Sequence, residues 1–379
     1  MKLRKFLMPV MAAAIIFTAC NEAENNPAPI ETGIPTISVD TTGKDTSVQG
    51  TIDEYFPFAQ GGYYVYDRTD ALGTSSTYNI YVEGNKMQRI SIAGSYRVTE
   101  IFEYTDGELR INYASDAASC FENLVDIKGS YPMTILKEPL TLGNTWETYS
   151  GPTIKGVAKG MCAITDVGVE IETPQGKVSA IEVSTELENG YTNVEYYAKG
   201  IGLVKNGYFI KGFETTNTNQ GVVNVTKAED MNTDMVLNSY ESGHSYEFII
   251  KLHHPNENVD ELEVKEFTYI FDENTSKEKI FEELLENSDG KENEKIISPN
   301  TTINSIAIER ALSQNIETGK STEVATVKVD LSKNFSDDMN AGSGYEMLLL
   351  QSLENTFKEF FKAAEFVLTV DGEPYVSKH

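Results

Sequence analysis

The chain has 379 residues and a formal net charge of −27 at pH 7, from 31 Lys and Arg against 58 Asp and Glu. A surface this acidic repels nucleic-acid phosphates and anionic lipid headgroups, so we expect no nucleic-acid partner. The length is enough for two domains that each bury a core of their own.

The first twenty residues follow the order of a secretory signal peptide. Lys2, Arg4 and Lys5 precede an apolar run over residues 6–17, and small residues stand just before Cys20. A helix of about 12 residues is too short to cross a hydrocarbon layer of about 30 Å. We therefore interpret residues 1–19 as a signal peptide and not as a permanent membrane span.

The stretch Phe17-Thr18-Ala19-Cys20 resembles a bacterial lipobox, although Phe17 stands where Leu is usual. The resemblance implies cleavage before Cys20 and two or three acyl chains there, which anchor a protein stably where one chain does not. We predict that Cys20 is a lipidation site, and that the protein is extracytoplasmic and lipid-anchored to the cell membrane. The alternative is an ordinary secreted protein whose cysteine lies near the cut by chance.

Residues 20–50 are predicted to be the lipidated cysteine and a disordered tether. They are rich in Asn, Glu, Pro, Thr and Ser and nearly free of aromatic residues, so they bury too little apolar surface to offset the entropy of ordering. Two folded regions follow, over residues 51–241 and 243–379.

Residues 51–241 are predicted to form an all-β domain with one strongly curved antiparallel sheet. Runs of aromatic and β-branched residues alternate with turn residues, and Asp106-Gly107 between two such runs is a strong hairpin signal. The last strand, over residues 235–240, is expected to close the sheet. The other expected strands cover residues 63–66, 78–82, 87–92, 96–104, 108–113, 160–167, 169–173, 178–186, 193–197 and 202–205.

Two blocks of this region share the pattern P-[FL]-x-x-G-x-x-[YW], at residues 57–64 and 139–146. We interpret them as two similar strand beginnings within one domain, and a duplicated unit is the alternative. The second block and Y-Y-A-K-G-I-G-L-V-K at residues 196–205 resemble a domain of exported Firmicutes lipoproteins. That resemblance implies a curved antiparallel sheet without catalytic chemistry.

Residues 243–379 are predicted to be a small α+β domain. Strands are expected over residues 246–252, 262–271, 303–308, 324–331 and 366–370, and capping boxes are expected at Thr275 with Glu278 and at Ser343 with Glu346. The first helix would bury one face and the second a longer apolar stripe. These faces comprise Ile280, Phe281, Leu284 and Leu285 in the first helix, and Leu349, Leu350, Leu353, Phe357, Phe360 and Phe361 in the second.

Four blocks of this region occur in the order of a known family. They are V-A-T-V-K-V-D-L-S-K-N-F at residues 324–335, G-S-G-Y-E at 342–346, S-L-E-N-T-F at 352–357 and F-V-L-T-V-D-G-E at 366–373. Together they resemble the GerMN domain, named from spore-germination and sporulation proteins. The resemblance implies a two-layer α+β fold that works in assemblies and is not an enzyme.

The search for reactive side chains finds no catalytic residue, no metal site and no cofactor motif. His253 and His254 are adjacent on a strand and so point to opposite faces, and His244 and His379 stand alone. The glycine pair Gly342 and Gly344 is interpreted as turn geometry and not as an anion cradle.

Two further candidates are weak. The run from Asp272 to Glu283 lacks the glycine of a calcium loop, and Asp330, Asp337 and Asp338 are more simply solvated carboxylates. Cys120 and Cys162 could form a disulfide or remain two buried thiols.

We therefore expect a lipid-anchored envelope protein that acts as a non-catalytic binding or scaffolding module. Its partner would be an envelope protein or the cell wall, in an assembly of the sporulation or germination type. The alternative function is a lipoprotein whose curved sheet binds a small apolar ligand or lipid.

Overall fold

The computed structural model describes residues 34–116, 118–129, 131–151, 158–188, 190–210, 233–314, 321–339 and 342–377. The chain divides into a first unit, Met1–Asp116 with Asn123–His244, and a second unit, Ala117–Glu122 with Ser245–His379. The predicted signal peptide, Cys20, the first part of the predicted tether and His379 lie outside the described residues.

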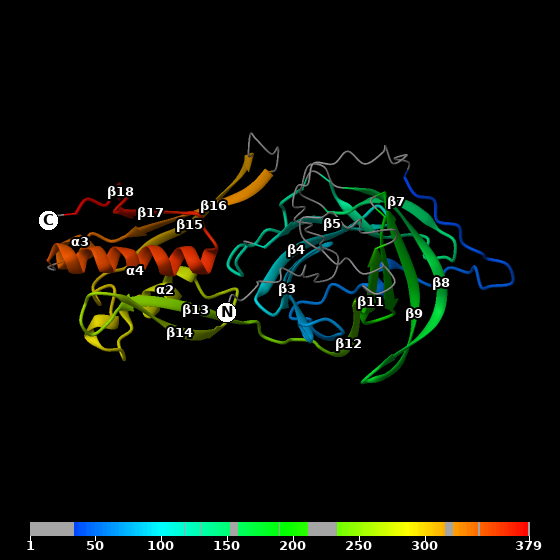
Figure 1. Cartoon of the computed structure of the whole chain (residues 1–379), viewed down its shortest axis with the longest axis horizontal. Helices are drawn as coiled ribbons and strands as arrows, with labels where there is room; N and C mark the ends of the chain where they lie inside the picture. The colour runs from blue at the N-terminus through cyan, green and yellow to red at the C-terminus, as the bar shows by residue number, and fades with distance from the viewer. Residues whose placement is uncertain are drawn as a thin grey trace, which may run out of the picture. The chain divides into compact units, whose positions relative to one another are not determined.

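In its described residues the first unit is a twelve-stranded antiparallel sheet with one short helix, so the predicted curved all-β domain is confirmed (Figure 1). The two strands predicted over residues 160–167 and 169–173 are one strand, β8, which continues through Gly168 with irregular register. The elements are α1 (Ile52–Tyr55), β1 (Tyr63–Arg68), β2 (Thr74–Glu83), β3 (Lys86–Ala93), β4 (Tyr96–Thr105), β5 (Glu108–Ser115), β6 (Met133–Lys137), β7 (Thr145–Tyr149), β8 (Lys159–Thr173), β9 (Gly176–Leu187), β10 (Tyr191–Ala198), β11 (Gly202–Ile210) and β12 (Thr233–Glu241).

The strand order is β6-β5-β4-β3-β2-β1-β12-β11-β10-β9-β8-β7. It consists of two six-stranded meanders, β1–β6 and β7–β12, joined where β12 pairs with β1. The first strand of each meander begins within the last two residues of one copy of the repeated sequence pattern. In both copies the glycine has a positive φ, at Gly61 and Gly143, and the closing aromatic residue, Tyr64 or Trp146, is buried. Both copies therefore lie at strand beginnings within one sheet, as we interpreted them from the sequence, and the two meanders are also compatible with the duplicated unit.

The two edge strands of the sheet, β6 and β7, are linked through side chains. The indole Nε1 of Trp146 and the hydroxyl of Thr148 both donate to the main-chain carbonyl of Thr134, at 3.1 and 2.9 Å. The curvature of the sheet therefore brings its first and last strands into hydrogen-bonding reach of each other.

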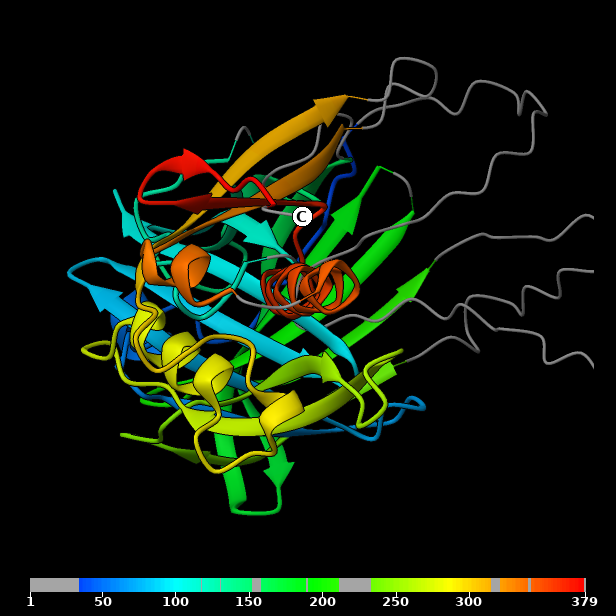
Figure 2. The ribbon, with the colours of Figure 1, turned by 90° about the vertical axis from the view of Figure 1, so that its left-hand side faces the viewer.

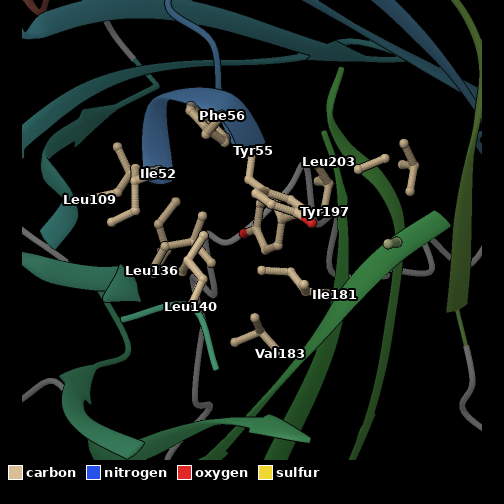
Figure 3. Packing of buried hydrophobic residues seen from close by; sticks show 14 of the residues in the cluster. Ile52, Tyr55, Phe56, Leu109, Leu136, Leu140, Ile181, Val183, Tyr197 and Leu203 are labelled. Atoms are coloured by element: carbon tan, nitrogen blue, oxygen red, sulfur yellow. The ribbon is translucent and has the colours of Figure 1, made fainter. Parts of the chain in front are cut away.

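The interior of the curved sheet is filled from one end by α1, which the sequence did not predict. Ile52, Tyr55 and Phe56 project from this helix and its C-terminus into a cluster of buried residues (Figure 3). The N–H of Ile52 donates to Glu138 Oε1 at 2.9 Å, which fixes the start of the helix. The helix meets side chains from strands and loops on several sides, including Leu109, Leu136, Leu140, Ile181, Val183, Tyr197 and Leu203.

The second unit has the predicted α+β composition. A four-stranded sheet has the order β15-β16-β17-β18, with β16 and β17 parallel, and β13 and β14 form a separate antiparallel hairpin. The elements are β13 (Glu247–Pro255), β14 (Leu262–Ile270), α2 (Lys277–Glu286), the 3₁₀ turn η2 (Glu292–Glu294), β15 (Ile303–Gln314), β16 (Ser321–Leu331), α3 (Asn334–Asp338), α4 (Ser343–Phe361), β17 (Glu365–Val370) and β18 (Glu373–Pro374).

Helix α4 lies between the four-stranded sheet and the β13–β14 hairpin, and Figure 2 shows it nearly end-on. Phe357 stacks on Phe281 of α2 at 4.6 Å between ring centroids and reaches Phe366 of β17 at 5.9 Å. Phe360 reaches Phe248 of β13 at 5.8 Å. One helix therefore supplies the apolar contact to both sheets.

Both helix starts differ from the predicted capping boxes. Helix α2 is capped by Ser276, whose hydroxyl accepts from the N–H of Lys279 at 3.2 Å, and the N-cap of α4 is Gly342, without a side-chain cap. The glutamates expected in the boxes have other partners: Glu278 Oε1 accepts from the N–H of Ile306, and Glu346 accepts from the Tyr375 hydroxyl at 2.6 Å. Tertiary contacts therefore outweighed the local pattern.

The buried stripe of α4 is largely as predicted, with two differences. Leu348 is buried although the prediction left it out, and Leu350 is only half-buried. Among the helices that the structure describes, none is long and apolar enough to span a membrane.

Replacing Leu353 by Ala tests the position of this stripe. Leu353 is fully buried, so the cavity left behind should lower the free energy of unfolding of the second unit by about 2–5 kcal/mol. The measurement is chemical denaturation followed by far-ultraviolet circular dichroism, while the single tryptophan, Trp146, reports the first unit separately. The matched control Leu350→Ala should cost clearly less, and equal costs for the two variants would show that the buried face is misplaced.

Candidate functional site

The most exposed apolar side chains on a sheet of the second unit lie on one face of the β13–β14 hairpin. Ile249, Val264 and Ile270 are 52, 52 and 62 % exposed. We call this surface the hairpin face. Several apolar side chains that are more than half exposed on one face of a strand pair are a candidate surface for contact with a partner.

The pairing register puts these residues close together. Ile270 lies opposite Glu247, and Ile249 occupies the next outward position along β13, opposite Thr268. Residues directly opposite each other in an antiparallel pair share a face, so the two isoleucines are diagonal neighbours. Val264 lies further along the same face.

Strand β13 carries apolar side chains on both of its faces. Phe248, Ile250 and Leu252 point inward and are buried, so the outward isoleucine at 249 interrupts an otherwise regular pattern. The free edge of β13 is covered by α4, where the N–H of His253 donates to the Thr356 hydroxyl at 3.0 Å. Strand β14 pairs with β13 alone among the described strands, and its second edge is therefore open.

Charged groups border the hairpin face. Glu359 of α4 binds Lys251 Nζ at 3.0 Å and His253 Nε2 at 2.8 Å. Burial alone would raise the pKa of Glu359, but the hydrogen bonds and charges of these two partners lower it below its ordinary value. This carboxylate therefore stays ionised and holds the basic side chains against the helix.

A second candidate is a groove beside the start of α4, with a volume of about 660 Å³ that includes open solvent. Its floor is apolar, with Ile297, Phe335 and Leu349, and its rim carries Asp338, which accepts from the Ser298 hydroxyl at 2.5 Å. Burial, and then the charge of Glu292, raise the pKa of Tyr345 at the rim, so the phenol keeps its proton as a donor.

The third candidate is a buried polar cluster inside the curved sheet of the first unit. Glu100 of β4 is 1 % exposed, and burial raises its pKa to about 7, with the charge of Glu195 adding to the shift while Arg89 and Ser91 oppose it. Burial also raises the pKa of Glu195, although Tyr197 and Asn206 donate to this carboxyl at 2.8 and 3.2 Å.

Arg89 is the basic group of this cluster. Its Nε donates to Asn79 Oδ1 at 3.0 Å, and its guanidinium carbon lies 4.8 and 5.0 Å from the ring centroids of Phe56 and Phe102. The charge is therefore stabilised by aromatic faces as well as by Glu100, which lies opposite it in the β3–β4 ladder. This arrangement is a closed polar interior and not an apolar chamber.

The residues that the sequence singled out are dispersed. His253 faces Glu359, and His254 is buried with Nδ1 2.9 Å from the Pro255 carbonyl, so the two rings do point to opposite faces. Cys120 and Cys162 are buried thiols in different units and form no disulfide. Gly342 and Gly344 are exposed at the start of α4.

The three aspartates considered for calcium have separate partners. Asp330 accepts from the Thr369 hydroxyl, Lys333 binds Asp337, and Ser298 donates to Asp338. Within the described ranges, no group of three or more His, Cys, Asp or Glu side chains is arranged to hold a metal ion.

The sequence did not reveal Glu100 and Glu195 as neighbours, because 95 positions separate them and only the closure of the sheet brings them together. The hairpin face left a signal that we did not use. Residues 248–250 are apolar in succession, which is one apolar residue too many for a strand with one solvated face.

Replacing Glu100 by Gln should remove a pH dependence of stability. The folded protein binds a proton at Glu100 up to about pH 7, whereas the unfolded chain releases it near pH 4.5, so stability is full below pH 4.5 and falls as the pH rises to 7. Relative to Glu100→Gln, the wild type should lose about 3 kcal/mol of unfolding free energy over this interval. Denaturation followed by Trp146 fluorescence measures the difference. Glu172→Gln, at an exposed carboxylate, is the control, and a constant difference between wild type and Glu100→Gln would contradict the assignment.

Comparison with solved structures finds low similarity. A candidate exported protein of Bacteroides fragilis with a YmcC-like fold is 14 % identical, with a TM-score of 0.29, over 50 % of this chain and 99 % of that one. A candidate lipoprotein of Parabacteroides distasonis is 14 % identical, with a TM-score of 0.27, over 49 % of this chain and 98 % of that one. At these TM-scores neither structure supports an argument about this chain.

Comparison with curated proteins gives no match. A family model gives one: the Germane family, described as "Sporulation and spore germination", matches residues 252–376, which include the end of β13, all of β14 and helix α4. The second unit therefore contains a Germane domain at residues 252–376, which confirms the resemblance to GerMN domains.

Proposed function

We propose that this protein is a non-catalytic, lipid-anchored envelope protein that binds a partner through its second unit. The observation that carries the proposal is the hairpin face, where three aliphatic side chains of one strand pair remain in water. The Germane domain supports a role in an assembly of the sporulation or germination type, because that is the description of its family.

The hairpin has two features that a partner could bind together. Strand β14 has an open edge, to which an extended segment of a partner can add as a third strand. The apolar side chains of Ile249 and Ile270 then provide the surface that such a partner covers. Main-chain hydrogen bonds would give affinity, and the positions of the isoleucines would select the partner.

Charge restricts the chemistry of the partner. Glu247 and Glu266 are exposed on the hairpin face, and the whole chain is strongly acidic. An acidic partner would be repelled, so the proposed partner is an envelope protein or a cell-wall component that presents apolar groups among neutral or basic ones.

The apolar-ligand alternative has no supporting observation among the described residues. The interior of the first unit holds a dense cluster of buried side chains around α1 and the polar groups of Arg89, Glu100 and Glu195. A small apolar ligand would have to displace the packed side chains or lie against the buried polar groups, and both are unfavourable. The proposal likewise includes no reaction, because the two carboxyls with raised pKa, Glu100 and Glu195, are enclosed in the sheet.

Replacing Cys20 by Ser tests the anchor. The variant cannot carry a thioether-linked lipid, so at least a tenfold smaller fraction should sediment with membranes of the native host. Immunoblots of membrane and soluble fractions measure the distribution, and Cys162→Ser, at a buried thiol, is the control. Unchanged sedimentation of the Cys20→Ser variant rules out lipidation as the means of attachment.

Replacing Ile249 and Ile270 together by Asp tests the hairpin face. Two carboxylates at the centre of the contact should reduce partner capture at least tenfold, because each would be desolvated without a counter-charge. Capture is measured by crosslinking in intact cells of the native host. Val367→Asp, at an exposed apolar position of β17 in the same unit, is the matched control. Equal capture by both variants, with native circular dichroism, would place the partner elsewhere.

A further inference from the structure

The second unit contains one short segment that comes from far away in the chain. Residues 118–122 lie between β5 and β6 in the sequence, but their contacts place them in the second unit. The segment has no helix or strand, and it lies outside the residues that match the Germane family.

Phe121 occupies an aromatic site in this unit. Its ring centroid lies 5.2 Å from that of Phe248 on β13 and 5.9 Å from those of Phe271 and Phe360. The contact with Phe248 is edge-to-face, at 88° between the planes. Three aromatic residues from three parts of the second unit therefore surround one ring supplied by the segment.

The next residue forms an ion pair with two hydrogen bonds. Arg310 of β15 donates from Nε to Glu122 Oε1 at 2.8 Å and from a terminal nitrogen to Oε2 at 2.7 Å. The two side chains are only 10 and 9 % exposed. Ser119 donates to Glu122 Oε2 from both its N–H and its hydroxyl, at 2.8 and 3.0 Å, so the segment orients its own carboxylate.

These contacts have the form of a ligand in a binding site. The guanidinium of Arg310 binds the carboxylate of Glu122 through two hydrogen bonds, and an aromatic cluster surrounds the ring of Phe121. The bound segment is short and has no regular secondary structure. A core element of the unit would instead be held by ladders or helix packing along its length. The segment also buries Ala118, Ser119 and Cys120, but no strand or helix includes it, so its local release breaks no ladder and no helix of the unit.

We propose that residues 118–122 are an intramolecular ligand, and that the site of Phe248, Phe271, Phe360 and Arg310 recognises an aromatic residue followed by a carboxylate. A partner protein that presents this pair in an extended segment binds when the internal copy leaves. The site is separate from the hairpin face, since Phe248 points inward and Ile249 outward on β13.

Thiol reactivity in the full chain tests the proposal. Cys120 lies inside the segment and is fully buried, while Cys162 is an equally buried thiol of the first unit and serves as an internal reference. In a Cys20→Ser background, Cys120 should react with a thiol reagent at least tenfold faster than Cys162, because release of the segment exposes it.

A peptide with the sequence of residues 115–125 and Ser in place of Cys120 should compete with the internal copy. It should raise the Cys120 rate at least fivefold in a saturable manner and leave the Cys162 rate unchanged. A control peptide with Phe→Ala and Glu→Gln at the positions of Phe121 and Glu122 should have no effect. A Cys120 rate that equals the Cys162 rate, or that no concentration of peptide changes, overturns the proposal.

Direct binding gives a second and independent measurement. The full-length variant Phe121→Ala with Glu122→Gln should bind the fluorescent peptide at least tenfold more tightly than the wild type, in which the internal copy competes. The variant Asn123→Ala, which leaves the segment intact, should bind like the wild type. A folded double variant that binds no better than wild type would contradict the proposal, and the thiol rates decide the question if that variant does not fold.

Discussion

The aromatic packing of α4 is the contact on which the rest of the second unit depends. Phe357 and Phe360 leave the same helix toward different layers, one toward α2 and β17 and the other toward β13. The helix takes the inner face of the β13–β14 hairpin, and Ile249, Val264 and Ile270 on the opposite face stay more than half exposed. The same cluster also receives Phe121. A single hydrophobic helix face thus creates both the exposed surface and the occupied site.

In the first unit, the interior of the curved sheet has to be filled. A sheet that curves until its edges meet encloses more space than its own strands fill, and the chain inserts α1 into that space. The remaining volume is polar, with Arg89 held between aromatic rings and two carboxyls whose pKa values burial has raised. Neutral carboxyls are far less costly to bury than ionised ones, so the cluster is compatible with a folded interior.

The strands and the family could be predicted, because alternation along a strand and the order of four sequence blocks are local signals. Helix faces were also local: Ile280, Phe281, Leu284 and Leu285 are all buried as expected. The errors have a common cause in long-range contacts. Glu278 and Glu346 were assigned to caps from spacing alone, whereas Ile306 and Tyr375 are their actual partners. No local signal could place residues 118–122 in the second unit, since the sequence around them belongs to the first.

The join between β6 and β7 has a consequence for how the first unit comes apart. Eleven neighbouring strand pairs in the sheet are connected by backbone ladders, whereas side chains that donate to main-chain carbonyls of β6 link it to β7. Trp146 and Thr148 donate to Thr134, and Asn144 donates to Lys137. We expect the sheet to separate first between β6 and β7, because no backbone ladder has to break there. Trp146 is the only tryptophan of the protein and lies at this join, so its fluorescence should change at the earliest stage of that separation.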